Sequence, residues 1–540
     1  MLDVHFVSGL ATACQTGKTQ PGVVGDGAIQ VGEMVSLADS FLQSPLLRRV
    51  LGASTETVEK LDRRLQSSSV WVACVMGVLA LQVALIFTHR PWLDEFQAIQ
   101  LAVQAPDVPS LLAWLRYEGH PPLWYLILRG LAHIVNPLDA LPITALLLAL
   151  PMQVAILFAS PFSRMERLLI ATSEFVLFEF LTLSRSLTLG ATVFVVVIAC
   201  WRRRWTWLGI AVLPFCDFLF GVLSGICVLL KFREKNVWWP GIALWLASGL
   251  VSGWMVLPAP DELSAFITIG LAHDALGWLS NIGTLALPFQ GGIIPFWNVP
   301  PFPVAGLLAP AFLWFAWLQT KGDHFHRAML FGFLGFTLLF SVAFYPFAIR
   351  HLMLAALLLI ALAWLRLDRG EHPSAGFRLW ILLAALCGLA TAAINLVKPF
   401  DTASVAAREI ERRGLAGKHW MVFPDSRAQG VSALTGIEFE RTERGCMESF
   451  IRWNYRSSLQ SADEMNAFLR RKVSAYGRFY LLSDVDLSLL LAPGLLQRIA
   501  YVPAGYDGQE FYLFVVGPNA AERPVSLPRC VPDQRPFARL

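Results

Sequence analysis

Charged side chains are scarce in this chain of 540 residues, and their scarcity limits the classes of protein to which it can belong. Asp, Glu, Lys and Arg make up 15% of the sequence, whereas hydrophobic residues make up 56% and the mean hydropathy is +0.55. A water-soluble fold of this size needs a larger charged surface, so the composition predicts an integral membrane protein. The formal net charge of +4 indicates no strongly basic surface, and we expect no nucleic-acid partner.

Motifs that bind common cofactors are also lacking. The chain has neither a G-x-x-x-x-G-K-[ST] loop nor a G-x-G-x-x-G fingerprint, so the sequence offers no recognisable cradle for ATP or a nucleotide sugar. Its eight cysteines include no C-x-x-C pair, and no close set of His, Asp and Glu has the spacing of metal ligands. We therefore expect no cofactor and no resident metal, with metal assistance by Asp94 and Glu95 as the alternative.

Two cysteines stand apart from the others because they lie in the polar C-terminal region. Cys446 and Cys530 can form one disulfide if that region faces an oxidising compartment. The sequence does not give the distance between them, so a disulfide and two free thiols both remain open. Most of the other cysteines lie inside apolar runs, where they behave as small hydrophobic residues.

Apolar segments predict the topology. The first, at 70–88, is about 19 residues long, which at a 1.5 Å rise spans the roughly 30 Å hydrocarbon layer. Basic residues precede it, so the positive-inside bias places residues 1–66 in the cytoplasm as a weakly patterned extension and the first outer loop, at 89–120, outside. Across 67–397 we expect roughly ten to thirteen spans, with one crossing undecided between residues 120 and 200.

One apolar segment, at 205–230, has basic residues at both ends. This pattern favours two half-helices that turn near Cys216 and Asp217 over a single crossing. From residue 398 onward the composition becomes globular, with helical and strand-like patterns that predict a small α/β domain at 398–540. The predicted fold is thus an α-helical polytopic membrane protein, and counting crossings from its basic loops places this C-terminal domain outside the cytoplasm.

The first outer loop carries the most informative residues. It reads P-W-L-D-E-F-Q, and then Y-E-G-H-P-P-L-W-Y. Asp94 and Glu95 are adjacent and cannot share a helix face, so only one can face a cavity, and we favour Asp94. Glu118 and His120 come directly before two prolines that restrict the backbone, and Tyr125 supplies an aromatic surface suited to a sugar or an isoprenoid. The alternative is that both acids complement the N-terminus of the following helix.

Polar residues inside or beside later apolar segments are further candidates. Arg185 costs about a few kcal/mol in an apolar layer if it is unpaired, so we expect it to meet an acid or a phosphate. Glu179 is the nearest acid in sequence, but a spacing of six places the two about 240° apart on a straight helix, so they pair only where the helix breaks. Arg350 and His351 stand at the outer mouth of a later span, where the arginine can hold a phosphate or snorkel to the interface.

These motifs together resemble a known superfamily. D-E-x-Q followed by E-G-H-P-x-L-W-Y resembles the first extracytoplasmic loop of bacterial C-type (GT-C) membrane glycosyltransferases, which include protein O-mannosyltransferases and aminoarabinose transferases. The segment at 177–190 resembles an E-Y-x-x-x-x-R-x-Y-x-L-G segment of the same group, with Phe180 and Leu187 in place of the tyrosines. Arg350 and His351 resemble the entry to a later span of that group.

The resemblance implies a function as well as a fold. It implies transfer of a sugar from a polyprenyl-phosphate carrier at the outer face of the cytoplasmic membrane, with membrane lipids around the protein and an acceptor that is a glycan, a lipid or a protein. Such a transfer needs a base for the acceptor hydroxyl and a cation for the departing phosphate. The expected catalytic residues are Asp94 and Glu95, and the expected substrate-binding residues are Glu118, His120, Tyr125, Glu179, Arg185, Arg350 and His351.

Two other functional classes remain open from the sequence. A transporter of lipid-linked sugars would carry polar residues along a path through the bilayer, whereas here they gather at its outer edge. An inactive scaffold protein of the same fold is the other alternative, because a shared fold does not establish an activity.

Overall fold

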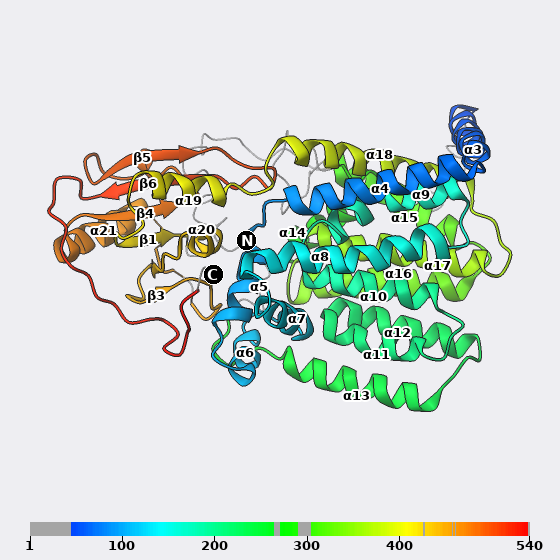
Figure 1. Ribbon diagram of the computed structural model, residues 1–540, viewed down its shortest axis with the longest axis horizontal. Coiled ribbons are helices and arrows are strands. Elements are labelled where there is room, and N and C mark those ends of the chain that lie inside the picture. Colours follow the sequence, from blue (N-terminus) through cyan, green and yellow to red (C-terminus); the bar gives the residue numbers. More distant parts are fainter. Residues whose placement is uncertain are drawn as a thin grey trace, which may run out of the picture.

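The structure, a computed structural model, describes residues 45–537 apart from 264–269, 290–303, 425–426, 456 and 460. The expected N-terminal extension therefore lies outside the described residues as far as residue 44. The protein is mostly helical (63%) and has two parts, a helical bundle and a smaller sheet domain at its C-terminal end. Figure 1 shows the two parts next to each other along the long axis of the molecule, with the helix α5 between them.

Most helices of the bundle run back and forth along its long axis (Figure 1). Its described elements, including the π-helical segments η1 and η2, are α3 (Pro45–Leu65), α4 (Ser68–Thr88), α5 (Leu93–Gln104), α6 (Val108–Leu115), α7 (Leu123–Ala132), α8 (Pro137–Val154), η1 (Ala155–Ala159), α9 (Arg164–Ala171), η2 (Glu174–Phe180), α10 (Ser186–Ala199), α11 (Thr206–Cys216), α12 (Phe218–Arg233), α13 (Trp239–Met255), α14 (Leu271–Thr284), α15 (Val304–Gln319), α16 (His324–Ala343), α17 (Ile349–Leu367) and α18 (Ala375–Val397).

Five of these segments are long and apolar enough to cross a membrane, judged by length and composition within the described residues. They are Ser68–Thr88, Pro137–Ala159, His324–Ala343, Ile349–Leu367 and Ala375–Val397. Other apolar helices are shorter than the roughly 20 residues that a 30 Å layer requires. The expectation of a helical chain with apolar segments that could span a membrane is confirmed. The expected ten to thirteen spans stay a prediction.

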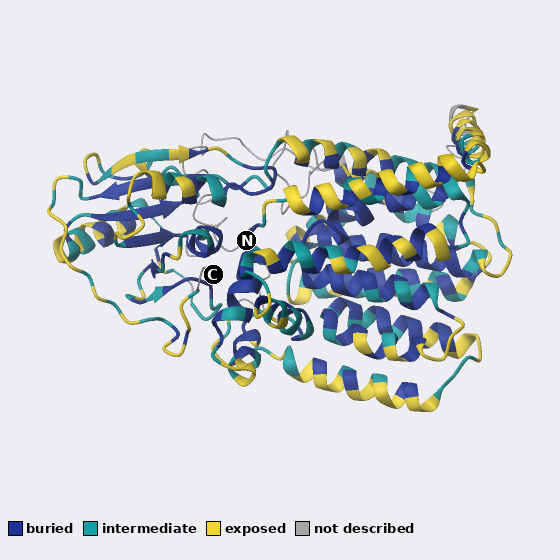
Figure 2. Cartoon of the chain, viewed as in Figure 1, coloured by how far each residue is buried: buried dark blue, intermediate teal, exposed yellow. Residues whose placement is uncertain are grey.

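The outer surface of the bundle is apolar in places where a soluble protein would be polar. On α13 the side chains of Trp239, Leu250 and Trp254 are 71%, 75% and 70% exposed. Figure 2 shows exposed positions along the outward sides of α4, α13 and α18, with buried positions toward the interior. Apolar surface of this extent is typical of a surface that faces another apolar phase, such as lipid.

Two breaks in the helices decide which polar residues approach each other. The predicted turn at Asp217 is confirmed, because α11 ends at Cys216 and the Asp217 carboxylate accepts the backbone N–H of Leu219 at 3.1 Å as the N-cap of α12. The apolar stretch at 166–184 is not one continuous helix. That segment divides at Ser173, whose hydroxyl caps the π-helical segment η2.

The C-terminal domain is a six-stranded sheet with helices on both faces. Strand order is β3-β2-β1-β4-β6-β5, with β1 parallel to β2 and β4 and the other pairs antiparallel. Its elements are α19 (Ala403–Arg412), β1 (Trp420–Phe423), α20 (Gln429–Thr435), β2 (Phe439–Arg441), β3 (Met447–Glu448), α21 (Ala462–Tyr476), β4 (Phe479–Ser483), β5 (Leu496–Val502) and β6 (Phe511–Val516), with a short 3-10 turn at Leu487–Leu489.

Alternate residues of the central strand explain why both faces are covered. Trp420 and Val422 pack in one apolar cluster with residues of α19 and α20, whereas Met421 and Phe423 pack in another with residues of α21. Successive side chains of a strand point to opposite faces, so a strand buried on both sides is apolar throughout, as this one is. The predicted small α/β domain is confirmed as a fold.

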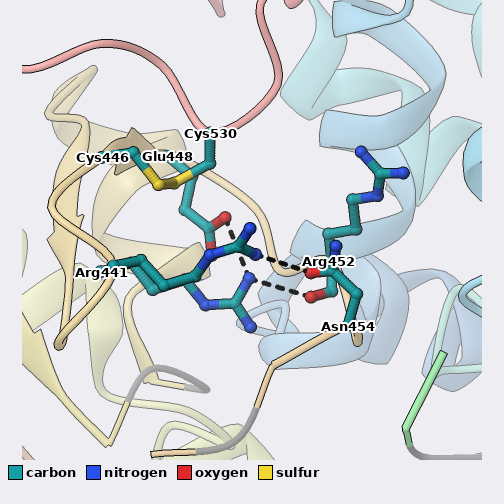
Figure 3. The surroundings of a disulfide bond; sticks show 7 residues. Arg441, Cys446, Glu448, Arg452, Asn454 and Cys530 are labelled. Carbon is teal, nitrogen blue, oxygen red and sulfur yellow. Dashed lines mark hydrogen bonds and ion pairs between the residues drawn. A yellow bond between two sulfur atoms is a disulfide. The ribbon is translucent and has the colours of Figure 1, made fainter. Parts of the chain in front are cut away.

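A disulfide lies at the β3 edge of the sheet. Cys446 and Cys530 are bonded, with their Cα atoms 5.0 Å apart and 84 positions apart in sequence, and Figure 3 shows the bond joining the β3 region to the C-terminal tail. Next to it, Arg441 lies 3.3 Å from Glu448 and donates a hydrogen bond to the backbone carbonyl of Arg452. The disulfide, which the sequence left open, ties the tail to the sheet.

We expect loss of this disulfide to destabilise the domain. A cross-link over a loop of this length is worth on the order of 2–4 kcal/mol, chiefly because it restricts the unfolded chain. The variant Cys446→Ser/Cys530→Ser should therefore have a lower Tm than the wild type, whereas Cys74→Ser, which changes a free thiol in α4, should not. Peptide mapping without reductant should recover the two cysteines in one linked fragment, and two separate thiol peptides would contradict the assignment.

Candidate functional site

A carboxylate between two guanidinium groups forms the centre of the candidate site. Asp94, in the first turn of α5, places its Oδ2 atom 2.7 Å from Nη2 of Arg185 and 3.6 Å from Nη2 of Arg350. Both guanidinium groups also lie over the ring of Trp92, at 5.4 and 5.5 Å from its centroid. Arg185 thus meets an acid, as expected for an arginine in an apolar segment.

The break in the chain before α10 explains how Arg185 reaches Asp94. Arg185 is extended and is the N-cap residue of α10, directly after the turn that follows η2. Its partner is therefore an acid 91 positions earlier in the chain. Arg350 approaches from the first turn of α17, so three elements that are distant in sequence converge at this point.

The charges of this cluster favour an anionic ligand. Burial alone would raise the pKa of Asp94, but the guanidinium groups of Arg185 and Arg350 outweigh it, and the pKa is lowered from its ordinary value. The carboxylate therefore stays ionised, and the three groups together carry one net positive charge. The Asp94 side chain is 31% exposed, whereas those of Arg185 and Arg350 are 9% and 10% exposed, so the cluster is open on the side of the acid.

Glu95 contacts a different set of groups from its neighbour Asp94. Its carboxylate lies 2.7 Å from Nε2 of His89 and accepts the backbone N–H groups of Trp92 and Ser184 at 3.1 and 2.7 Å. The residue has no exposed surface. These contacts join the end of α4, the start of α5 and the break before α10, so the geometry gives this second predicted catalytic acid a structural role.

A histidine and a second aspartate lie beside the cluster. Nδ1 of His120 is 3.2 Å from Oδ2 of Asp217, which also accepts a hydrogen bond from the Ser186 hydroxyl at 3.2 Å. Burial alone would lower the pKa of His120, but the carboxylates of Asp217 and Glu118 outweigh it and the pKa is raised. Sequence reasoning placed a helix break at Asp217 without assigning it to the site. The usable signal was an acid at the tip of an apolar hairpin.

Glu118, in the loop before α7, is held by a hydrogen bond from α5. Its Oε1 atom accepts a hydrogen bond from Nε2 of Gln97 at 2.9 Å. Burial raises the pKa of Glu118 to about 7, against the opposing influence of the hydrogen bond from Gln97 and of the charge on His120. Unlike Asp94, this carboxylate has no Lys or Arg ion-pair partner among the residues that the structure describes.

The remaining predicted residues are also buried. Tyr125 is 4% exposed and packs in the apolar cluster between α5 and α7. Glu179 is 1% exposed on η2, and its carboxylate interacts electrostatically with Arg350. The His351 ring lies 5.1 Å from that of Phe347, centroid to centroid. These residues line or support the cluster from the bundle side.

Known proteins offer no further guide to this site. No family model matches the chain, and neither curated proteins nor solved structures give a match. Within the described ranges, no group of three or more His, Cys, Asp and Glu residues is arranged to hold a metal ion. The chemistry of the site therefore has to be inferred from its own side chains.

A stability measurement tests the structural role of Glu95. Glu95→Ala leaves two buried backbone N–H groups without their acceptor, and each such loss costs about 1–3 kcal/mol. We expect a clear drop in Tm for this variant in detergent or nanodiscs, and little change for Glu56→Ala, an exposed acid of α3. A wild-type Tm for Glu95→Ala would contradict the structural role.

Proposed function

We propose that this protein is a membrane glycosyltransferase that moves a sugar from a polyprenyl-phosphate carrier to an acceptor at the outer face of the cytoplasmic membrane. The observation that carries the proposal is the position of Asp94 between Arg185 and Arg350, on the half-open side of a cluster at the end of an apolar bundle. A sugar linked to a lipid phosphate presents an anion and a long apolar chain together. A cationic cluster next to apolar helices fits both.

The reaction assigns a role to each charged group. Asp94 takes the proton of the acceptor hydroxyl, and the freed oxygen forms a bond to the anomeric carbon. The bond from that carbon to the phosphate oxygen breaks, and the electron pair leaves with the phosphate. Arg185 and Arg350 stabilise the charge on the departing phosphate with guanidinium N–H donors, which suit phosphate oxygens.

The apolar surface and the disulfide support the proposed location. Five candidate spans and the exposed tryptophans of α13 fit a lipid environment. Disulfides persist in oxidising compartments, so the bond between Cys446 and Cys530 favours an extracytoplasmic C-terminal domain. The full set of ten to thirteen spans is part of the same proposal.

Polar residues inside the bundle favour an enzyme over a transporter. Gln153 donates a hydrogen bond to Gln82 at 3.2 Å, and Gln82 donates to Thr182 at 3.3 Å. All three residues are buried, at 2% exposure or less. Such a seam holds helices together and provides no open polar path along which a sugar could cross the bilayer.

Asp94→Asn should abolish transfer in a protein that still folds, with a lower Tm because Arg185 and Arg350 lose their anion. Asparagine has the same shape but cannot accept the proton, and loss of a catalytic base costs about 10²–10⁴-fold in rate. The measurement is release of radiolabelled sugar from a polyprenyl-phosphate donor in proteoliposomes, with Tm as the check on folding. Asp107→Asn, which keeps a capping side chain at the start of α6, is the matched control and should retain activity. Full activity of Asp94→Asn would reject the proposal.

Orientation can be tested with single added cysteines. In the proposed topology Asp107 faces outward and Lys235, in a basic turn after α12, faces the cytoplasm. A membrane-impermeant thiol reagent should label Asp107→Cys in intact cells and label Lys235→Cys only after permeabilisation. The reverse pattern would place the Asp94 cluster on the cytoplasmic side and remove the basis for an outer-face reaction.

A further inference from the structure

Three glutamines of α5 share one face of that helix and are all buried. Gln97, Gln100 and Gln104 follow each other at spacings of three and four, which places them on a single face. Their exposed fractions are 4%, 0% and 0%. Buried amides are costly unless they are hydrogen-bonded, so their partners decide what this face contacts.

All three amides contact the C-terminal domain, which follows α5 by more than 300 positions. Gln97 donates to the backbone carbonyl of Ile451 at 2.7 Å and accepts the backbone N–H of the same residue at 3.0 Å. Gln100 donates to the carbonyl of Gln429 at 3.1 Å. Gln104 accepts a hydrogen bond from the Ser449 hydroxyl at 2.7 Å. The glutamine face is therefore the docking surface of α5 for the sheet domain. Figure 1 shows that α5 lies next to this domain.

Gln97 differs from the other two because it also reaches the candidate site. Its Nε2 group carries two hydrogens and has two acceptors, the carbonyl of Ile451 and Oε1 of Glu118 at 2.9 Å. Its Oε1 atom is occupied by the N–H of Ile451, which fixes the orientation of the amide. The position of the Glu118 carboxylate thus depends on a backbone segment of the C-terminal domain.

We propose that Gln97 is a positioning residue through which docking of the C-terminal domain holds the Glu118 carboxylate in the site, where it accepts a hydrogen bond from a hydroxyl of the sugar or the acceptor. The role of Glu118 rests on the proposed function, whereas the coupling through Gln97 does not. The C-terminal domain is then a component of the site, because its backbone fixes the amide that holds Glu118.

The charged and polar groups around Glu118 determine the direction in which its pKa changes when the Gln97 donor is lost. His120 faces it from its own loop, Asp94 and Gln97 from α5, Tyr125 from α7 and Trp453 from the C-terminal domain. Burial raises the pKa of Glu118 to about 7, and the hydrogen bonds from Gln97 and Trp453 both lower it. Loss of the Gln97 donor therefore raises the pKa further, and the ionised fraction at neutral pH falls.

Gln97→Met and Gln100→Met form a matched pair for the test. Each replaces one buried amide of α5 by a side chain of similar length, and each removes a contact with the domain, but only the first contacts Glu118. We expect the acid limb of kcat/KM for Gln97→Met to move to higher pH, with about a tenfold loss below pH 7 that is recovered above pH 8. Gln100→Met should keep the wild-type pH profile. Equal shifts in the two variants would overturn the proposal.

A spectroscopic titration tests the coupling without any turnover. The infrared carbonyl band of protonated Glu118, assigned by its loss in Glu118→Gln, should titrate at higher pH in full-length Gln97→Met than in the wild type or Gln100→Met. Trp453→Phe removes the other donor from the domain and should shift the midpoint in the same direction, so the result does not depend on one variant. Wild-type midpoints in both variants would overturn the coupling. Absence of sugar transfer by the wild type would instead reject the proposed function alone.

Discussion

The ion pairs of Asp94 with Arg185 and Arg350 are the constraint on which the rest of the site depends. Two nearly buried guanidinium groups at the end of an apolar bundle repel each other and lose hydration, so they need an anion close by. Asp94 supplies it, and Trp92 lies under both cations. The two ion pairs require the starts of α5, α10 and α17 to be held in fixed positions. Glu95 holds the first two together by accepting the backbone N–H groups of Trp92 and Ser184.

Helix α5 connects this charged cluster with the C-terminal domain. Its first turn carries Asp94, and its buried glutamine face contacts residues more than 300 positions later. A short helix held at its end by ion pairs and along one face by neutral amides has little freedom to rotate. A movement of the sheet domain would therefore reach Glu118 through Gln97. The two parts of the molecule meet where the chemistry is proposed to occur.

Several elements of this arrangement follow from local sequence patterns. The turn at Asp217 was predictable because the apolar stretch at 205–230 has basic residues at both ends, which favours a hairpin over a single crossing. The α/β domain was predictable from its helical and strand-like patterns. The division of Asp94 from Glu95 follows from helix geometry. The break at Ser173 was not predicted, because an apolar run carries no mark of where hydrogen bonding between turns is interrupted. The partner of Arg185 was predicted as a class of residue and not as Asp94.

The sequence by itself determined an apolar, mostly helical chain, a C-terminal α/β domain and a first loop that concentrates acids, a histidine and aromatic residues. Periodicity and composition act over a few turns, so local patterns suffice for these features. Only the tertiary structure decided that Asp94 lies between two arginines, that His120 meets Asp217 and that the α5 glutamines meet the sheet domain. These contacts span about 90 to 350 positions, and they depend on how helices of similar apolar character pack against each other, which no local pattern specifies.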